Sequence, residues 1–209
     1  MPRPLPREFF ARDVLQVAPA LLGQHVRHGK VVLRITEVEA YRWPGDTACH
    51  ARAGKTERTA ALFGPPGRAY VYLCYGLHQM LNLVTGEDGV AQAVLIRAAE
   101  PVDGLATIRR RRRGKDGPVL LTGPGKVGQA LGIDTSFTGD AVHRAGGLVV
   151  EPGPPPEAIA VGTRIGIDFA EPAHRALPWR FAIAGSTWVT HRRGLVPAAS
   201  SKSTRARRS

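Results

Sequence analysis

The sequence predicts one domain of mixed helices and strands. Runs of β-branched and aromatic residues that end at glycine turns predict the strands, and apolar residues at helical spacing that end at glycine predict the helices. The hydrophobic content of 43% is ordinary for a protein with a globular core. The proline-rich loop at residues 151–158 has the composition of a domain boundary. The chain that follows it is too short to form an independent domain.

The composition is strongly basic, with 29 lysines and arginines against 17 aspartates and glutamates and a net charge of +12. This balance favours a polyanion as partner, with nucleic acid ahead of a membrane surface. No apolar run approaches the length of a membrane span, and the N-terminal residues lack the apolar centre of a signal peptide. The two cysteines, Cys49 and Cys74, are too few for a disulfide framework. We therefore expect a soluble cytoplasmic protein that binds no membrane, associated with the nucleoid if it is bacterial.

The first predicted element is a helix that follows Asp13, a residue type that caps helix N-termini, and stops at Gly23. Pro19 lies inside its apolar stripe, so we expect this helix to be short or kinked. The helix is expected to turn its apolar stripe toward the core.

Residues 31–41 predict a strand whose alternate positions are apolar at first and acidic at its end, at Glu37 and Glu39. In one interpretation, which holds unless a bulge resets the alternation, a glutamate projects from the edge of a core face, where loss of solvent raises a carboxylate pKa and suits a general base. In the other, the strand runs out into solvent with two solvated glutamates. The strand pattern alone favours the solvated glutamates.

Residues 42–68 predict a long loop with a short helix near residues 57–62. A loop of this length inside a compact domain is often functional. Cys49 and His50 are adjacent in it, but no second cluster with ligand spacing accompanies them. We therefore expect no zinc site.

Residues 67–84 predict a β-hairpin with its turn at Tyr75-Gly76. Tyr70 and Tyr72 share one face of its first strand, because side chains alternate along a strand. Tyr75 stands at the turn, where a side chain can point off the end of the hairpin. In so basic a protein, such an aromatic suggests a wedge that enters stacked bases. Taken alone, the hairpin favours the other interpretation, in which its tyrosines are half-buried core residues.

A mostly apolar strand over residues 90–97 ends at Arg97. An arginine at the end of a buried strand needs a carboxylate partner, and the two glutamates of the earlier strand or Glu100 would serve. A helix over residues 102–113 follows and ends in five consecutive arginines. Because such a run wraps around the helix, we expect solvated surface, with a secondary contribution to phosphate attraction.

A further helix opens at Gly123-Pro124-Gly125-Lys126 and stops at Gly132. Its glycine-rich start offers free backbone N–H groups beside the lysine, which suits an anion. It is not a Walker A loop, because Leu120 and Val127 stand where that motif needs glycine and serine or threonine. Strands are also expected near residues 159–167 and 180–184.

Several separated motifs occur along the chain in one order: Glu37-Val38-Glu39-Ala40-Tyr41, His50, Lys55-Thr56-Glu57-Arg58, Phe63-Gly64-Pro65-Pro66-Gly67, Tyr70-Val71-Tyr72-Leu73-Cys74-Tyr75-Gly76, Asn82, Val94-Leu95-Ile96-Arg97-Ala98-Ala99-Glu100-Pro101, and Gly123-Pro124-Gly125-Lys126 with Gln129-Ala130-Leu131. In order and spacing they resemble the alkyladenine (3-methyladenine) DNA glycosylase family, over nearly the whole chain. The resemblance implies a single α+β domain over residues 1–191, with a curved antiparallel sheet, surrounding helices and a protruding hairpin that inserts into DNA. Residues 192–209, which lie outside the resemblance, are expected to form a basic, disordered C-terminal tail.

The activity that the resemblance implies is that of a monofunctional DNA glycosylase. Such an enzyme flips an alkylated or deaminated purine out of double-stranded DNA and hydrolyses its glycosidic bond, which initiates base excision repair. We expect a monomer that uses no metal and no other cofactor. The resemblance does not rank the lesions among 3-methyladenine, 7-methylguanine, hypoxanthine and ethenoadenine.

The resemblance also implies a role for each matching residue. Glu39 would activate water, which Arg97 and the main-chain carbonyl of Ile165 would help to hold. Tyr75 would be the wedge that fills the gap left by the flipped nucleotide. The remaining expected site residues are Tyr41, His50 and Tyr72 as walls of the base pocket, Asn82 as the residue that disfavours the amine of guanine, and Arg58, Arg68 and Lys126 as contacts to the DNA backbone.

Two positions depart from the pattern of related sequences, which often have asparagine at Thr59 and methionine at Leu62. We expect both to lie in the loop lining, where they bear on damage preference and not on the chemistry. Two other functions stay open. One is a damaged-DNA-binding module without catalysis, in which Glu39 is structural, and the other is a base hydrolase that acts on RNA.

Overall fold

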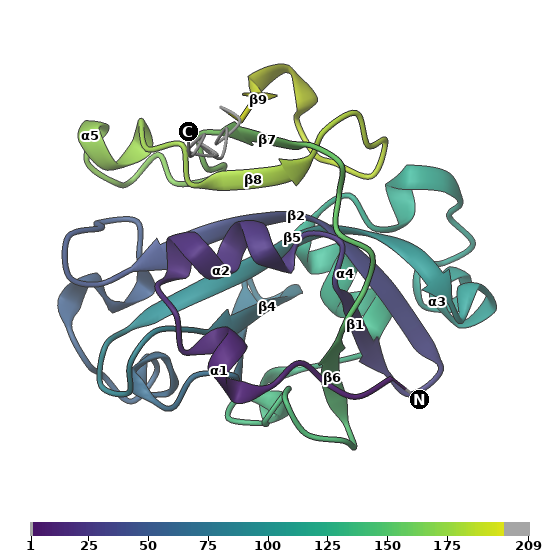
Figure 1. The fold of residues 1–209 in the computed structure, drawn as a ribbon, viewed down its shortest axis with the longest axis horizontal. Coiled ribbons are helices and arrows are strands. Elements are labelled where there is room, and N and C mark those ends of the chain that lie inside the picture. The colour runs from purple at the N-terminus through teal and green to yellow at the C-terminus, as the bar shows by residue number, and fades with distance from the viewer. Residues whose placement is uncertain (1, 199–209) are drawn as a thin grey trace, which may run out of the picture.

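The structure is a computed structural model that describes residues 2–198, and within that range it forms one α+β domain built on a single nine-stranded sheet (Figure 1). All strand pairings in the described range are antiparallel, in the order β3-β4-β5-β2-β8-β7-β9, with β1 pairing to β2 and β6. The strands are β1 (His25–His28), β2 (Val31–Arg42), β3 (Ala69–Cys74), β4 (His78–Val84), β5 (Gln92–Asp103), β6 (Leu148–Glu151), β7 (Ile159–Gly162), β8 (Arg180–Ile183) and β9 (Val196–Pro197).

Five α-helices and five short 3₁₀ helices occur in the same described range. The α-helices are α1 (Arg7–Phe10), α2 (Val14–Leu21), α3 (Leu105–Arg111), α4 (Pro124–Leu131) and α5 (Pro172–Arg175). The 3₁₀ helices are η1 (His50–Ala53), η2 (Ala60–Phe63), η3 (Gly117–Leu120), η4 (Thr135–Phe137) and η5 (Arg192–Gly194). The longest described helices have eight residues, so none of them could cross a bilayer, which takes about 20 residues.

The two longest strands, β2 and β5, form the middle of the sheet. Helix α2 packs on both, and helix α4 packs on β4 and β5 (Figure 1). The side chains of Leu21, Leu33 and Ile96 are fully buried between these layers. Register shifts interrupt the β2–β5 ladder on both sides of Glu37. A bulge of this kind bends a strand and breaks the simple alternation of its faces, which matters for the residues that follow.

The two longer helices form as the sequence predicts. The Asp13 side chain accepts a hydrogen bond from the backbone of Leu15 at 2.8 Å and so caps α2, which continues through Pro19 to Leu21. Helix α4 begins at Pro124 and ends at Leu131. The next residue is Gly132, whose φ of +66° is the left-handed conformation that glycine adopts without strain.

Other boundaries differ from the expectations. Strand β5 continues to Asp103, so α3 starts at Leu105 and not at residue 102. The long loop holds two 3₁₀ turns, η1 and η2, where one helix was expected near residues 57–62. Strand β7 ends at Gly162. The strands β1, β6 and β9 and the helices α1 and α5 have two to four residues each, too few to show a period in the sequence.

The arginine run at the end of α3 is not simply solvated. Arg111 Nη1 donates to the carbonyl of Ala130 at 2.7 Å, and Arg112 Nε donates to the carbonyl of Leu120 at 2.8 Å. These contacts join α3 to α4 and η3. The expectation of solvated surface is therefore wrong for these two arginines, which occupy backbone carbonyls that would otherwise lack donors.

The C-terminal stretch expected to be a tail contributes to the domain at its start. Within it, Arg192–Gly194 forms η5, and β9 at Val196–Pro197 pairs antiparallel with β7. The expectation of disorder is therefore wrong for these two segments, and the part of the expected tail at residues 199–209 lies outside the described residues.

Candidate functional site: a pocket backed by a buried glutamate

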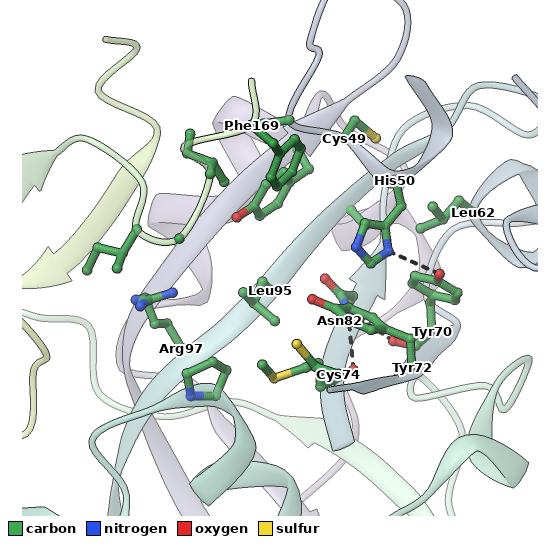
Figure 2. A pocket seen from close by; sticks show the side chains of 18 of the residues that line it. Cys49, His50, Leu62, Tyr70, Tyr72, Cys74, Asn82, Leu95, Arg97 and Phe169 are labelled. Carbon is green, nitrogen blue, oxygen red and sulfur yellow. Dashed lines mark hydrogen bonds between the residues drawn. The ribbon is translucent and has the colours of Figure 1, made fainter. Parts of the chain in front are cut away.

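A pocket of about 300 Å³ lies along the β3–β4 hairpin (Figure 2). Aromatic side chains supply much of its wall, and its polar groups come from separate parts of the chain. The residues that border it include Tyr41, Cys49, His50, Leu62, Tyr70, Tyr72, Tyr75, Asn82, Leu95, Arg97, Pro124, Ile165 and Phe169. The structure thus brings together all five residues that the sequence analysis assigned to the base pocket: Tyr41, His50, Tyr72, Asn82 and Ile165.

Glu39 is fully buried directly behind this wall. Its Oε1 accepts a hydrogen bond from the backbone N–H of Ile165 at 2.8 Å. Its Oε2 accepts one from the Tyr41 hydroxyl at 2.8 Å and one from Arg97 Nη1 at 3.2 Å. All three donors belong to residues that border the pocket. The expectation of a solvated glutamate is therefore wrong, and the expected loss of solvent is confirmed. The core face is not, because the register shifts beside Glu37 place Val38 and Ala40 in the core with Ile35 and turn Glu39 away from it.

Burial raises the pKa of Glu39 above its usual range. The Arg97 charge, the Ile165 N–H group and the Tyr41 hydroxyl lower that pKa, whereas the charge of Glu37 adds to the rise. Burial outweighs the donors, so Arg97 offsets the loss of solvent only in part. A carboxylate with a raised pKa is a stronger base once it is ionised.

Glu37 forms a second buried carboxylate beside the first. It accepts hydrogen bonds from Arg180 Nη1 at 3.0 Å and from the backbone N–H of Thr190 at 2.7 Å. Arg97 lies between the two glutamates, with its Nε 3.7 Å from Glu37 Oε1. Register shifts on both sides of Glu37 allow this residue and Glu39 to be enclosed together, so the expected solvated state is wrong for Glu37 as well.

Arg97 has the carboxylate partner that its place in a buried strand requires. Of the three glutamates considered from the sequence, Glu37 and Glu39 are close to it, whereas Glu100 pairs with Arg34 at 2.8 Å. Arg97 is only 8% exposed and still borders the pocket. Its guanidinium can therefore contact both the buried carboxylates and a molecule in the pocket.

His50, Tyr70 and Tyr72 form one aromatic side of the pocket (Figure 2). The His50 and Tyr72 ring centroids are 4.2 Å apart, with an interplanar angle of 67°. The Tyr70 hydroxyl lies 3.3 Å from His50 Nδ1. Burial, together with the charges of Arg58 and Arg52, lowers the pKa of His50 to about 4, so the imidazole is neutral near pH 7.

The Tyr41 ring is held from behind by a buried ion pair. The Arg164 guanidinium carbon lies 4.7 Å from the centroid of this ring. Arg164 Nη2 donates to Asp46 at 2.8 Å, and Arg164 Nη1 donates to the carbonyl of Ala40 at 3.0 Å. Both charged side chains are fully buried. This pair also fixes the start of the loop that presents Ile165 to Glu39.

Asn82 and Leu62 border the pocket, but Thr59 does not. Asn82 Nδ2 donates to the carbonyls of Tyr70 at 3.2 Å and Met80 at 3.3 Å, which fixes the plane of the amide. The Thr59 hydroxyl lies 2.9 Å from that of Thr56 and donates to the carbonyl of Gly54. The expectation that Thr59 lies in the lining is therefore wrong. Thr59 instead stabilises a turn within the long loop.

The tip of the hairpin is apolar and exposed. Tyr75 is 92% exposed at the edge of the pocket, and its neighbours Leu73 and Leu77 are exposed as well. Its φ of +49° is uncommon for a residue other than glycine, so the tight turn imposes a definite direction on the chain. A Cβ added at Gly128 of α4 would lie 2.2 Å from the carbonyl oxygen of Gln79. Helix α4 therefore packs with its backbone against β4 and supports the hairpin.

The three expected backbone-binding cations lie at different places. Arg58 is exposed, and its charge acts on His50 and Tyr70. Lys126 stands in the first turn of α4, next to the pocket residue Pro124. Arg68 lies before β3, at the end of that strand away from the hairpin turn, and its Nη1 donates to the carbonyl of Gly139. Arg68 is therefore not part of the pocket wall.

Phe169 and its neighbour Arg52 were not anticipated from the sequence. Phe169 borders the pocket and is 60% exposed, with the Arg52 guanidinium carbon 4.9 Å from its ring centroid. A single phenylalanine in an irregular loop gives no periodic signal, so sequence reasoning had no means to find it.

Cys49 borders the pocket as a protonated thiol, because burial raises its pKa to about 11. A thiol of this kind is a poor nucleophile and a poor metal ligand. Within residues 2–198, no group of three histidine, cysteine, aspartate or glutamate side chains is arranged to hold a metal ion.

Comparison with known proteins adds an independent observation. Residues 8–187 match the family described as methylpurine-DNA glycosylase (MPG). The chain is 59% identical over 193 residues to a protein of Nitrosococcus oceani named "Putative 3-methyladenine DNA glycosylase", an alignment that covers 92% of this chain and 96% of that protein. It is 55% identical over 188 residues to the "DNA-3-methyladenine glycosylase" of Arabidopsis thaliana, covering 89% of this chain and 74% of the relative.

Proposed function

The chain belongs to the methylpurine-DNA glycosylase family, and from this premise we propose how its pocket acts on damaged DNA. It is a hydrolase of the DNA-3-methyladenine glycosylase type, an enzyme of base excision repair. In our proposal it extrudes an alkylated or deaminated purine from double-stranded DNA into the pocket. A water activated by Glu39 then attacks the sugar carbon of the glycosidic bond, and an intact strand with an abasic site remains.

One observation supports this mechanism above all: a buried carboxylate lies behind the wall of an aromatic pocket and is held there by three donors from that wall. Its raised pKa and its fixed position suit a general base. A module that only bound damaged DNA would need no carboxylate held by the wall of its pocket.

The chemistry needs only one carboxylate, because the leaving group is already activated. An alkylated purine such as 3-methyladenine carries a positive charge and departs readily, so it needs little help from a general acid. Ordinary glycosidases instead use a pair of carboxylates, one of which protonates the leaving oxygen. In the proposal Glu39 removes a proton from water, while Arg97 and the main-chain carbonyl of Ile165 hold that water.

The walls of the pocket favour an electron-poor base. The rings of Tyr41 and Tyr72 border the pocket, and the face of an aromatic ring attracts a cation. His50 is neutral near pH 7 because its pKa is about 4, so it does not repel a positively charged purine. Asn82 carries an amide of fixed orientation at the wall, which in the proposal disfavours the exocyclic amine of guanine.

Extrusion of the base requires a side chain that replaces it in the stack. Unstacking and unpairing a base costs a few kcal/mol. The exposed Tyr75 at the hairpin tip is suited to enter the gap and restore stacking, and the nearby Leu77 adds apolar surface. In the proposal Arg58 and Lys126 hold the DNA backbone near the pocket, Arg68 adds positive charge farther away, and the enzyme acts as a monomer.

Release of the base tests the proposal. Purified protein should liberate 3-methyladenine from methylated duplex DNA and leave an unmethylated duplex of the same sequence unchanged. The strand should break only after alkali, and borohydride should trap no protein–DNA adduct, because no lysine nucleophile takes part. Equal release from methylated RNA would favour a base hydrolase of RNA, and binding without release would favour a binding module.

A further inference from the structure

A hydroxyl group stands between Arg97 and the second buried carboxylate. It belongs to Thr190, in the segment that follows β8. The Thr190 Oγ1 accepts a hydrogen bond from Arg97 Nε at 3.2 Å and donates to the carboxylate of Glu37 at 2.8 Å. A hydroxyl has one proton to give and lone pairs that accept, so both contacts can be made at once.

We propose that Thr190 is a positioning residue for the glycosylase reaction. Its hydroxyl, hydrogen-bonded to Glu37, holds the guanidinium of Arg97 so that Nη1 faces Glu39. This inference rests on the proposed function, in which Glu39 is the base. Thr190 does not border the pocket, so it would act only through Arg97.

The contacts of Arg97 explain why it needs this support. An arginine side chain has many rotamers, and this one is held by a hydrogen bond to Glu39 from Nη1 and a hydrogen bond to Thr190 from Nε. Its Nε is 3.7 Å from Glu37, beyond hydrogen-bond distance. Without the hydroxyl, the attraction between opposite charges would draw the guanidinium toward Glu37 and away from Glu39.

Thr190 is itself firmly held. Its backbone N–H donates to Glu37 Oε2 at 2.7 Å, and its carbonyl accepts from Arg180 Nη1 at 3.1 Å. Arg180, which is 2% exposed, also donates to Glu37 and, from Nε, to the carbonyl of Thr163 at 2.7 Å. The same arginine thus fixes Thr190 and the start of the loop that leads to Ile165.

The pH dependence of the reaction should show whether Thr190 holds Arg97 beside Glu39. The groups that face Glu39 are Arg97 from β5, Tyr41 and Glu37 from β2, and the backbone N–H of Ile165. Arg97 lowers the pKa of Glu39, so a displaced guanidinium would let this pKa rise. Because the base must be ionised, the acid limb of the rate profile would then move to higher pH.

The test compares variants of Thr190 that lack the hydroxyl with one that keeps it. Thr190→Val removes the hydroxyl at nearly constant volume, Thr190→Ala removes it with less bulk should valine not fit, and Thr190→Ser restores it. Thr36→Val is the matched control, because Thr36 Oγ1 donates to the carbonyl of Trp188 and so holds the same C-terminal segment without contact to either carboxylate.

The measurement is the single-turnover release of 3-methyladenine from methylated duplex across the pH range, with thermal unfolding of each variant. We expect Thr190→Val and Thr190→Ala to slow release about tenfold at neutral pH, the effect of one hydrogen bond to a charged group. Their acid limbs should lie at higher pH, and Thr190→Ser should return both the rate and the limb to those of the parent protein. Thr36→Val should lower thermal stability while its pH profile stays in place.

Two further variants distinguish failure of this inference from failure of the proposed function. In an Arg97→Lys background, which has no guanidinium to position, Thr190→Val should cause no additional loss. If the hydroxyl-free variants keep the parental profile, or if they lose rate in parallel with Thr36→Val and without a shift of the limb, Thr190 is structural only and this inference is wrong. Glu39→Gln with undiminished release would instead overturn the proposed function, and this inference with it.

Discussion

The Tyr41 hydroxyl donates a hydrogen bond to Glu39 Oε2 at 2.8 Å, two residues away on β2. The ring of the same tyrosine borders the pocket, and the Arg164 guanidinium lies against it from behind. One side chain therefore joins the wall that would hold the base to the carboxylate that would activate water. Since the ring and the hydroxyl belong to the two different tasks, substitution can separate them.

Tyr41→Phe should keep the wall and weaken the base. The phenylalanine ring retains the stacking surface, but Glu39 loses a donor that lowers its pKa, so this pKa rises further. The acid limb of the rate profile should move to higher pH, with a loss of about threefold to tenfold on the acidic side. Single-turnover excision across the pH range measures this. Tyr41→Leu, which loses the ring as well, should also bind damaged DNA more weakly; profiles identical to the parent would contradict the hydrogen bond's role.

His50 should remain neutral throughout the working range. Its lowered pKa of about 4 means that the unfolded chain takes up the proton first, so acidification from about pH 6.5 should destabilise the fold progressively down to about pH 4. His50→Gln should remove part of this dependence and leave the acid limb of excision where it was. Histidine NMR resonances followed against pH give the pKa directly. A midpoint near 6.5 for His50 would contradict the burial of its imidazole.

Tyr75 should act through stacking. Tyr75→Ala should weaken binding to damaged duplex by about 1–3 kcal/mol, the contribution of one aromatic stack, and should reduce the extruded fraction of the base. A fluorescent base analogue placed next to the lesion measures extrusion. Tyr75→Phe is the control that keeps the ring and should behave like the parent protein. Equal extrusion by the alanine variant would exclude the wedge.

The ion pair of Arg164 and Asp46 should dominate local stability. Asp46→Asn leaves Arg164 buried without its counter-charge, which typically costs about 3–5 kcal/mol. Chemical denaturation measures the loss. The exposed pair of Arg109 and Asp116 offers a control, because Asp116→Asn should leave the denaturation midpoint unchanged. An unchanged midpoint in Asp46→Asn would show that the pair does not hold the pocket wall.

Local patterns in the sequence were sufficient to predict many of the strands and helices that carry the site. The hairpin around Tyr75, the long strand through Glu39 and the helix at Pro124 each carry a period, a cap or a turn, and each forms as predicted. The need of Arg97 for a carboxylate also follows from its place in an apolar strand, and the structure supplies that partner.

Other parts of the site depend on contacts between distant residues. Arg164 and Asp46 are 118 residues apart, and Glu37 and Thr190 are 153 residues apart, so no local pattern links them. The pattern of residues along β2 also did not predict that both of its glutamates are buried. The shifts of register beside Glu37 turn both glutamates away from the core residues Ile35 and Val38, and the segment of Thr190 then covers Glu37.

The most direct test of the account is Glu39→Gln, measured for both excision and binding. This variant keeps the size of the side chain and removes its ability to take a proton. Single-turnover release of 3-methyladenine should fall by at least ~100-fold, the contribution of a general base, while affinity for damaged duplex stays largely the same. Glu100→Gln is the matched control, since Glu100 pairs with Arg34 away from the pocket and its loss should leave release unchanged. Release by Glu39→Gln at the rate of the parent protein would contradict the central claim that this buried carboxylate activates the water.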